Sequence, residues 1–467
     1  MSDTAWPPNM QEWQRLSPRM LLVHPVHEVL NQLPLLIGAI VVGSATQNPV
    51  WSLIGVGLIV VLGLARWFTT SYRIDDRDVT LRTGLLQRNE LSVPRNRIRS
   101  VQTEARLLHR LLGLTVLRVS TGQEAKGDNA FELDAVRSDQ VVALRALLLG
   151  EYRADAPEAE RLASWEPSWL RYSALSWSGL LMIGAALGVA YQAGFGDVLH
   201  EWVLMFGGAW LILAAVSAGL VLAVGRSLLT YGNLVLTRRA DTLHLVHGLL
   251  KIREHTYDLR RLRGGTLREP LLVRALGGAR LDAVMTGVAG AGESSLLLPA
   301  CPAGTARRVL TELVAEPDVV DAALVAHGPA AARRRWVRAM VLPVVLAAVL
   351  VLAPLPGWVW GLWVVLVGCC VLLALDRVRA LGHRVDGRWL VTRAGSVERR
   401  RDCVQTAGII GWTVRQTWFQ RRAGVATLVA ATAAGTKRYV LIDVPAELAW
   451  TVAATASPWV ADSVWCA

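Results

Sequence analysis

Six apolar stretches constrain this chain of 467 residues more than any other feature of its sequence. A helix that crosses a bilayer needs about 20 mainly apolar residues. The stretches that reach or approach this length are Val29–Thr46, Val50–Phe68, Ser173–Gln192, Val203–Gly225, Ala339–Pro354 and Trp358–Leu375. Short turns that contain glycine, proline or asparagine join them in pairs. We therefore expect six membrane-spanning helices arranged in three hairpins.

The alternative is a set of buried helices in the core of a large soluble protein. Helices of that kind usually carry a polar stripe with a period of 3.6 residues. None of the six stretches has an acidic or basic side chain near its centre, which favours the membrane. Pro343 is expected in the first turn of its span, where a missing N–H group does little harm.

The placement of the arginines predicts the orientation of the chain. It has 49 basic and 37 acidic residues and a net charge of +12, and the three hairpin turns contain no lysine or arginine. Loops on the cytoplasmic side of a membrane carry an excess of basic residues. We therefore expect a multi-pass protein of the cell (plasma) membrane with both termini in the cytoplasm. No cleavable signal peptide is expected, because the first apolar run begins only at Val29.

The segments that follow the hairpins share one pattern. Offsets of 164 and 311 residues place the segment that begins at Tyr72 over two later segments. The shared features are the glycine pairs Gly84 and Gly113, Gly248 and Gly277, and Gly395 and Gly424, each 29 positions apart, with Arg110, Arg274 and Arg421 three positions before the second glycine. We infer three copies of one unit, which consists of a helical hairpin and a cytoplasmic domain.

Each soluble segment is typical of short strands followed by a helix. In the first copy, alternating apolar residues predict strands at 79–82, 85–93, 98–102 and 115–120, and one or two helical turns at 105–112 that end at Gly113. The closing helices are expected at Ser138–Leu149, Thr305–Val314 and Ala446–Ala456. A small curved sheet or barrel covered by the final helix is the simplest packing for this order.

The same residues resemble a known family. The residues are Tyr72, Ile74, Gly84–Leu86, Val93–Pro94, Arg97–Val101, Leu107–Leu114 and Thr121–Gly122, and their pattern resembles the bacterial pleckstrin-homology-like (PH-like) membrane proteins of the YdbS/YdbT type. The second copy matches well, whereas the third has Gln405 and Gly408 where Pro94 and Arg97 stand. The resemblance covers nearly the whole chain and implies a PH-like barrel with a C-terminal helix. It transfers no catalytic residue.

The expected fold is therefore an α+β membrane protein with six transmembrane helices in three hairpins, each followed by a cytoplasmic PH-like β-barrel or sheet capped by a C-terminal helix. The expected boundaries are a cytoplasmic run-in at 1–28, hairpins at 29–68, 173–225 and 339–375, PH-like domains at 69–150, 226–316 and (divergent) 376–467, and linkers at 151–172 and 317–338. Each linker lies either along the inner membrane surface or free in solvent.

No group of residues indicates catalysis, a metal or a cofactor. His24 and His27, and likewise His244 and His247, have a three-residue spacing, but no third ligand stands nearby. Gly287–Gly292 is glycine-rich, but no helix opens after it, so it is interpreted as a loop between strands rather than a phosphate site. We predict that the chain is not an enzyme and holds no metal or cofactor.

Arginine clusters are the candidate contacts with anionic membrane lipids or a protein partner. Each basic side chain near an anionic leaflet contributes about 1 kcal/mol of attraction. The clusters are Arg88, Arg95, Arg97 and Arg99 in the first copy, Arg260, Arg261 and Arg263 in the second, and Arg399, Arg400 and Arg401 in the third. The alternative is that they reflect the positive-inside bias alone. Nucleic acid is not an expected partner, because the clusters lack interleaved aromatic residues.

These observations favour a non-enzymatic protein that presents three PH-like domains at the inner leaflet as an interaction or scaffold module. The resemblance adds a link to envelope stress and to resistance against membrane-active antimicrobial peptides. It also suggests a small one-domain homologous membrane protein as a partner, and a homo-oligomer is compatible with the sequence. The alternative function is a transporter or export component, which would usually keep ionisable residues inside its spans.

Overall fold

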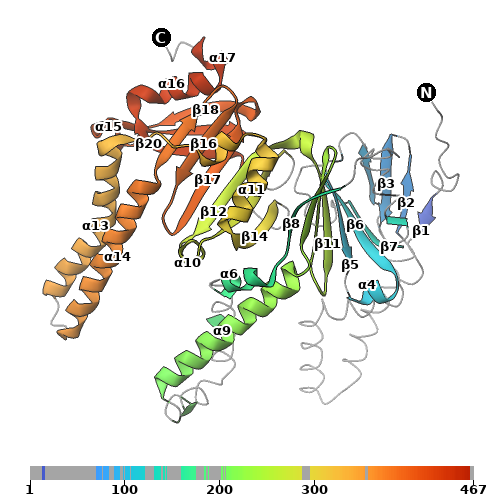
Figure 1. Cartoon of the computed structure of the whole chain (residues 1–467), viewed down its shortest axis with the longest axis horizontal. Coiled ribbons are helices and arrows are strands. Elements are labelled where there is room, and N and C mark those ends of the chain that lie inside the picture. The colour runs from blue at the N-terminus through green and yellow to red at the C-terminus, as the bar shows by residue number, and fades with distance from the viewer. Residues whose placement is uncertain are drawn as a thin grey trace. The chain divides into compact units, whose positions relative to one another are not determined.

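The computed structural model (Figure 1) describes residues 13–15, 70–120 with gaps at 76, 84–88, 95–97, 99 and 106, 131–137, 159–174, 207–286, 295–352 and 356–462, together with 140, 141, 144, 184, 185, 188, 201, 202 and 205. The chain divides into two compact units. The first unit is Met1–Ser164 with Leu229–Arg260, and the second is Trp165–Leu228 with Arg261–Ala467. The chain therefore passes from one unit to the other three times.

The described residues of the first unit form two antiparallel sheets. The smaller has the strand order β1-β2-β3-β4 and the larger has the order β7-β6-β5-β11-β10-β9-β8. Their strands are β1 (Gln14–Arg15), β2 (Ser71–Ile74), β3 (Asp78–Thr83), β4 (Asn89–Pro94), β5 (Ser100–Ala105), β6 (Leu114–Ser120), β7 (Phe131–Arg137), β8 (Glu160–Ser164), β9 (Val235–Arg239), β10 (Thr242–His247) and β11 (Ile252–Asp258). Apolar side chains from β2 to β7 form one buried core, with Ile74, Val79 and Leu117 at most 1% exposed.

The second unit has a six-stranded sheet, β14-β13-β12-β17-β16-β15, and a three-stranded sheet, β18-β19-β20. The strands are β12 (Leu262–Pro270), β13 (Gly278–Met285), β14 (Leu296–Pro302), β15 (Gly382–Val385), β16 (Trp389–Ala394), β17 (Glu398–Gln405), β18 (Ile409–Arg415), β19 (Val425–Thr432) and β20 (Arg438–Pro445). Val284, Leu390 and Val404 of the larger sheet share a buried core with the smaller sheet and the closing helix α16 (Ala446–Ala456). This is the sheet-and-helix packing that the order of elements predicts.

Short helices cover or connect these sheets. They are α4 (Leu107–Leu111), η3 (Pro167–Trp169), α6 (Leu170–Ala174), η5 (Leu259–Arg261), α10 (Leu271–Ala275), α11 (Ala303–Val314), α12 (Pro317–Asp321), η6 (Thr406–Gly408), α15 (Trp418–Arg422) and α17 (Pro458–Ala461). The closing helices expected at 305–314 and 446–456 are α11 and α16. The one expected at 138–149 lies mostly outside the described residues, and Gln140, Val141 and Leu144 are helical.

Among the residues that the structure describes, three helices are long and apolar enough to cross a membrane: α9 (Gly208–Tyr231), α13 (Gly328–Leu352) and α14 (Trp358–Ala380). They coincide with the predicted spans Val203–Gly225, Ala339–Pro354 and Trp358–Leu375. The predicted spans Val29–Thr46 and Val50–Phe68, and most of Ser173–Gln192, lie outside the described residues. The arrangement of six spans in three hairpins therefore stays a prediction.

The helices α13 and α14 extend beyond the apolar stretches at their basic ends. α13 begins at Gly328, eleven residues before the expected span, and α14 ends at Ala380 rather than Leu375. Arginine is a good helix former, so the basic segment continues the helix instead of ending it. Our placement of Pro343 in a first turn was therefore wrong, because this proline lies inside α13.

Strand pairing joins halves of different predicted domains. β5, from the expected domain 69–150, pairs with β11 from the expected domain 226–316, and β12 of the latter pairs with β17 from the expected domain 376–467. The sequence pattern assigned β5, β11 and β17 to three separate PH-like regions. The residue pattern specifies each strand and its faces but not its partner. Because β11 passes through η5 into β12, two successive strands of one copy belong to different sheets.

The paired glycines occupy equivalent turns. Gly113, Gly277 and Gly424 follow the short helices α4, α10 and α15 and have φ angles of 68°, 74° and 65°. A glycine that follows a helix commonly adopts this left-handed conformation, as we predicted for Gly113. Gly248 and Gly395 have φ angles of 105° and 100° at the turns that follow β10 and β16.

Candidate functional site: the junction of the helix hairpin and the sheets

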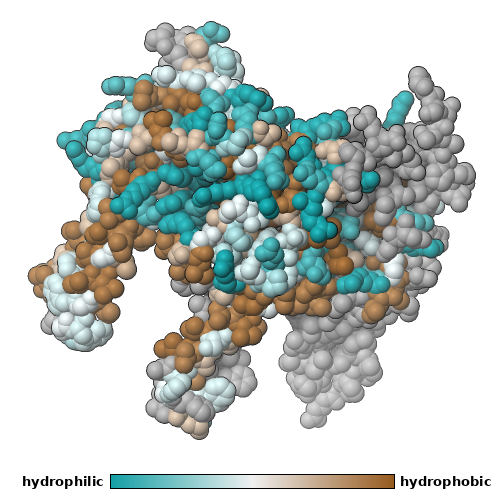
Figure 2. Space-filling model, in the orientation of Figure 1, coloured by the Kyte–Doolittle hydropathy of each residue, from teal (hydrophilic) through white to brown (hydrophobic). Residues whose placement is uncertain are grey.

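The helices α13 and α14 of the second unit lie side by side and form a hairpin. The indole N–H of Trp363 in α14 donates a hydrogen bond to the backbone carbonyl of Pro343 in α13, at 3.0 Å. Figure 2 shows this pair as a largely hydrophobic projection from a body that carries many hydrophilic residues. Charged side chains at the ends nearest the sheets connect the hairpin to that body.

A carboxylate in the last strand holds the beginning of α13. Asp443 of β20 is completely buried, and its Oδ1 lies 3.2 Å from the Nε of Arg334, while its Oδ2 lies 3.2 Å from a terminal nitrogen of Arg335. The side-chain amide of Gln420 in α15 donates a further hydrogen bond to Oδ1 at 2.9 Å. Asp443 has a φ angle of 58°, in the left-handed region that Asp and Asn tolerate better than most residues. This bulged residue thereby ties the helix to the sheet.

A second group of charges holds the end of α14. Asp376 accepts hydrogen bonds from Arg274 of α10 at 2.8 Å and from Arg399 of β17 at 2.5 Å. Arg399 also lies 3.9 Å from Glu269 of β12, which accepts a hydrogen bond from Arg307 of α11 at 3.2 Å. Acidic and basic groups alternate along this chain of contacts, so each charge has an opposite neighbour.

The last carbonyls of α14 also have a partner. Arg393 of β16 donates hydrogen bonds to the backbone oxygens of Ala380 and Arg379, each at 3.0 Å. The carbonyls at the C-terminal end of a helix lack partners inside the helix and carry partial negative charge, which an arginine satisfies. The beginning of α13 and the end of α14 are thus both fixed to the sheets.

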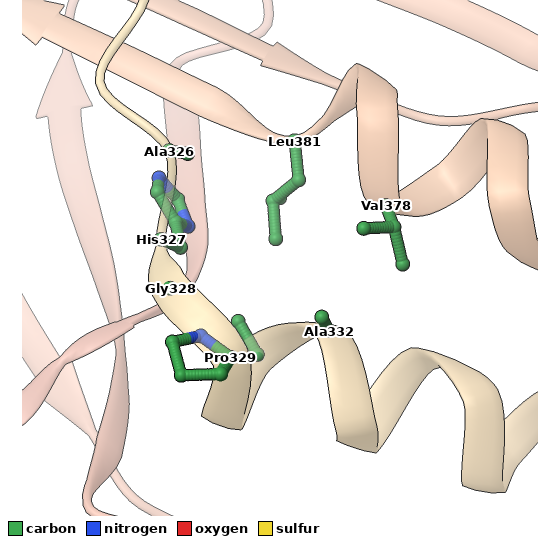
Figure 3. Close-up of a pocket in the computed structure, with 8 residues that line it drawn as sticks. Ala326, His327, Gly328, Pro329, Ala332, Val378 and Leu381 are labelled. Carbon is green, nitrogen blue, oxygen red and sulfur yellow. The ribbon is translucent and has the colours of Figure 1, made fainter.

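The buried His327 and His383 lie beside these contacts, next to a small cavity whose lining residues, His327 among them, are drawn in Figure 3. The Nδ1 of His327 donates to the carbonyl of Ile442 at 2.8 Å, so its Nε2 is free to accept from the Nδ1 of His383 at 2.9 Å. Burial lowers the pKa of His327, and burial with the nearby His327 lowers the pKa of His383 to about 4. The pair is therefore neutral at neutral pH.

The cavity has a volume of about 270 Å³ and lies between the beginning of α13 and the end of α14. Its lining is mostly apolar, with Pro329 and Ala332 on one helix and Val378 on the other, next to Leu381 (Figure 3). His327 is the one titratable residue among those that line it. Both nitrogens of this imidazole are already hydrogen-bonded, so the cavity offers apolar contact rather than a charged anchor.

The predicted arginine clusters have different surroundings. Arg88, Arg95, Arg97 and Arg99 lie outside the described residues. Arg260 is well exposed, at 76%, and lies 3.4 Å from Asp241 and 3.7 Å from Asp258. Arg261 is half-buried, and Arg263 donates to the side chain of Gln405 at 3.0 Å. The second cluster therefore retains one strongly exposed cation.

The third cluster is engaged in internal contacts. Arg399 binds Asp376 as described above, Arg400 donates to Asp402 at 2.9 Å, and Arg401 donates to the carbonyl of Ala322 at 3.0 Å. Asp402 also accepts a hydrogen bond at 2.7 Å from the buried hydroxyl of Thr266. These side chains form contacts inside the second unit. That they contact lipid stays a prediction.

Two exposed apolar pairs next to the hairpin, on the short helices α10 and α15, were not predicted from the sequence. Leu271 and Leu272 of α10 are 37% and 42% exposed, and Trp418 and Phe419 of α15 are 61% and 70% exposed. An offset of 147 residues relates the two pairs. α10 contacts the end of α14 through Arg274, and α15 contacts the beginning of α13 through the shared Asp443. In the sequence, each pair stands just before one of the arginines that the copies share, Arg274 or Arg421, and this position could have revealed both pairs.

The chemistry of the described part of the chain is limited. Within it, no group of three or more His, Cys, Asp or Glu side chains could hold a metal ion. Burial raises the pKa of the Cys301 and Cys403 thiols to about 12, which keeps them protonated and unreactive. The predictions of no enzyme activity and no cofactor stay predictions.

Comparison with known families places two regions of the chain. The bacterial PH domain matches residues 29–152 and 339–456, just over half of the sequence. The chain belongs to the bacterial PH domain family. The resemblance inferred from the sequence pattern is thereby confirmed, and the third PH-like region, which we considered divergent, is one of the two that match. No curated protein and no solved structure shows significant similarity to this bacterial PH domain protein.

Each match begins at an expected hairpin and ends near the closing helix of the PH-like region. In the second match, the hairpin α13–α14 and the sheets that it joins are described together. The second matched region thus includes part of the junction, since Asp376, Arg399 and Asp443 lie within residues 339–456, whereas Arg274, Arg334 and Arg335 lie outside them.

Proposed function

We propose that this bacterial PH domain protein is a non-enzymatic scaffold of the cell membrane. It crosses the membrane several times with both termini in the cytoplasm, and it presents three copies of a hairpin-plus-PH unit at the inner leaflet. Its role is to bind partners there and to transmit changes between the bilayer and the sheets. In the cell it acts in envelope stress, and specifically in resistance to membrane-active antimicrobial peptides.

The observation that carries this proposal is the charged junction. A flexible tether would need no such ion pairs, whereas the buried Asp443 and the partly buried Asp376 hold both helices of the hairpin against the sheets. Removing one partner from a buried ion pair typically costs about 3–5 kcal/mol. A tilt of the hairpin therefore moves the sheets with it, which suits a protein that reports on the state of the membrane.

Lipid contact at the base of the hairpin completes the proposal. The exposed Trp418 and Phe419 lie on α15, next to arginines 421 and 422 and near the beginning of α13. Aromatic side chains favour the boundary between headgroups and acyl chains, and neighbouring arginines favour anionic lipid. We place α15, and with it α10, against the inner leaflet.

An environment-sensitive fluorophore can test this contact in the full-length chain, reconstituted in vesicles with anionic lipid. We expect a blue-shifted emission from a label at Phe419→Cys, after subtraction of the signal from the labelled wild-type chain. The control is Trp459→Cys on α17, because Trp459 is also a large exposed residue, at 55%. Equal emission from both positions would contradict lipid contact by α15.

Survival of cells challenged with a cationic antimicrobial peptide tests the function itself. A strain that lacks the protein should regain resistance with the wild-type chain but not with Asp443→Asn, which uncouples the hairpin. Membrane levels of both chains must be equal. Full resistance with Asp443→Asn would refute coupling as the mechanism. Solute flux in proteoliposomes that contain the purified protein would favour a transporter instead.

A further inference from the structure

Two sheet interfaces join successive copies, and they have the same register. In the first, Thr103 of β5 is opposite Glu254 of β11, and in the second, Leu267 of β12 is opposite Arg401 of β17. The offset of 164 residues relates Thr103 to Leu267, and the offset of 147 residues relates Glu254 to Arg401. The chain thus makes the same antiparallel contact twice, each time between the later half of one copy and the earlier half of the next.

Each of the two strand types that form these interfaces also occurs once at the open edge of a sheet. By the same offsets, β4 corresponds to β11 and β17, and β18 corresponds to β5 and β12. β4 and β18 are the terminal strands of their sheets, and neither has an outer partner among the residues that the structure describes. Asn89, Glu90 and Ser92 of β4 are exposed, as are Thr413 and Arg415 of β18.

A pair of glycines marks the open position. A Cβ atom added at Gly264 of β12 would collide with the carbonyl oxygen of Cys403 in the adjacent β17. At the corresponding Gly411 of β18, nothing among the described residues lies within 4 Å of such an atom. The place that a neighbouring strand fills beside β12 is therefore open beside β18.

We propose that the β18 edge of one chain pairs with the β4 edge of a second copy of the same chain. The shared register assigns the partners: residues 89–93 of β4 lie antiparallel to residues 411–415 of β18, with Glu90 opposite Val414 and Leu91 opposite Thr413. The partner of β18 follows from the two existing interfaces. There, the strands that correspond to β4, namely β11 and β17, pair with the strands that correspond to β18, namely β5 and β12. The proposal uses the three-copy organisation given under Proposed function and adds an assembly to it.

The alternative is that both edges are protected against pairing. Proline and bulges commonly protect edge strands, and β4 ends at Pro94 while β18 has a bulge between Ile409 and Gly411. Neither feature prevents this contact. The same bulge occurs in β12, between Leu262 and Gly264, and β12 is paired with β17. Residue 94 corresponds to Asp258 and Gln405, which lie just beyond the paired residues of the two existing interfaces.

The contact is head-to-tail, since different edges meet. Such contacts form a ring when the rotation closes and a filament when it does not. Copies in one membrane share the same orientation, so the rotation axis is perpendicular to the bilayer. A ring would pair every β4 with a β18 and leave no open edge of either kind.

Cysteine cross-linking in native membranes tests the register. Two differently tagged full-length chains are expressed together, one with Glu90→Cys and the other with Val414→Cys. Directly opposed residues of an antiparallel pair have Cα atoms about 4.5–5.5 Å apart, within the range that a disulfide spans. We expect an oxidised species that carries both tags, several-fold more abundant than with wild-type chains. The matched control replaces Val414→Cys by Arg415→Cys, which points to the opposite face of the sheet.

Three results would overturn the proposal: no species with both tags, equal cross-linking to position 415, or a disulfide formed only within one chain or with another protein. The mass of the wild-type protein in mild detergent provides a second measurement that needs no substitution. A particle of two or more chains is expected, and a monomer counts against the assembly. Survival under peptide challenge remains a separate test of the scaffold, so the two proposals can fail independently.

Discussion

Replacement of Asp443 by asparagine should detach the beginning of α13 from the sheets. Asparagine has the same shape and also tolerates the φ angle of 58°, so the backbone of β20 should be preserved. The charge is lost, and Arg334 and Arg335, only 10% and 15% exposed, keep two buried guanidinium groups without their carboxylate. Breaking a buried pair in this way costs about 3–5 kcal/mol.

Hydrogen exchange of the full-length chain in detergent measures this loss locally. A loss of 3 kcal/mol lowers the protection of the amides in β20 and the first turns of α13 by roughly a hundredfold or more, since each 1.4 kcal/mol is tenfold. Arg333→Gln is the matched control, because Arg333 lies on the same helical turn but is exposed. Combining Asp443→Asn with Arg334→Met and Arg335→Met should restore much of the protection, because the unpaired charges are gone.

Unchanged protection in Asp443→Asn would refute the reasoning, and so would an equal loss in Arg333→Gln. The first result would mean that the arginines find water or lipid phosphate as readily as the carboxylate. The second would mean that any loss of positive charge near the membrane loosens the helix, irrespective of the buried pair.

Three further changes test other parts of the structure through melting of the purified full-length protein. First, the pKa of His383 is about 4 in the folded chain and 6.5 in the unfolded chain, so the unfolded chain binds more protons between these pH values. The free energy of unfolding should therefore fall by up to about 3 kcal/mol as the pH drops from 6.5 to 4. The variant His383→Gln should show a weaker dependence on pH. Second, Gly264→Ala should destabilise the chain by about 1–3 kcal/mol, because Gly264 has a φ angle of 134° and faces the carbonyl of Cys403; no change in melting would contradict the clash. Third, neither ring nitrogen of the buried His255 has a hydrogen-bond partner among the described residues, and burial lowers the pKa of this imidazole to about 3. The variant His255→Phe should therefore stabilise the chain by about 1–2 kcal/mol. A lower melting temperature would mean that the imidazole has a hydrogen-bond partner outside the described residues.

Local features of the fold were predictable from the sequence. Apolar length indicated the helices α9, α13 and α14, and the sequence around Gly113 indicated the turn that this glycine makes after α4. These properties depend on a few neighbouring residues, so a pattern in the chain carries them directly. The family followed from the same local patterns, since the resemblance rested on turns and strand starts.

Contacts between distant residues were not predictable in the same way. A run of arginines looks alike whether it faces lipid or binds groups inside the protein, so the contacts of Arg399 with Asp376 and of Arg401 with the carbonyl of Ala322 were not predictable. Asp443 carried no signal at all, because its partner Arg334 stands 109 positions earlier. The pairing of β5 with β11 was missed for a similar reason, since alternation defines the faces of a strand and not its neighbour.

The order of synthesis gives the arginines at the start of α13 two successive tasks. They emerge from the ribosome roughly a hundred residues, and thus several seconds, before Asp443 does. During that interval they are bare positive charges beside a nascent apolar helix, and in the orientation that we propose they would keep this segment on the cytoplasmic side during insertion. The carboxylate can neutralise them only after β20 has been made, so the charges that we propose to orient the helix later become part of its anchor.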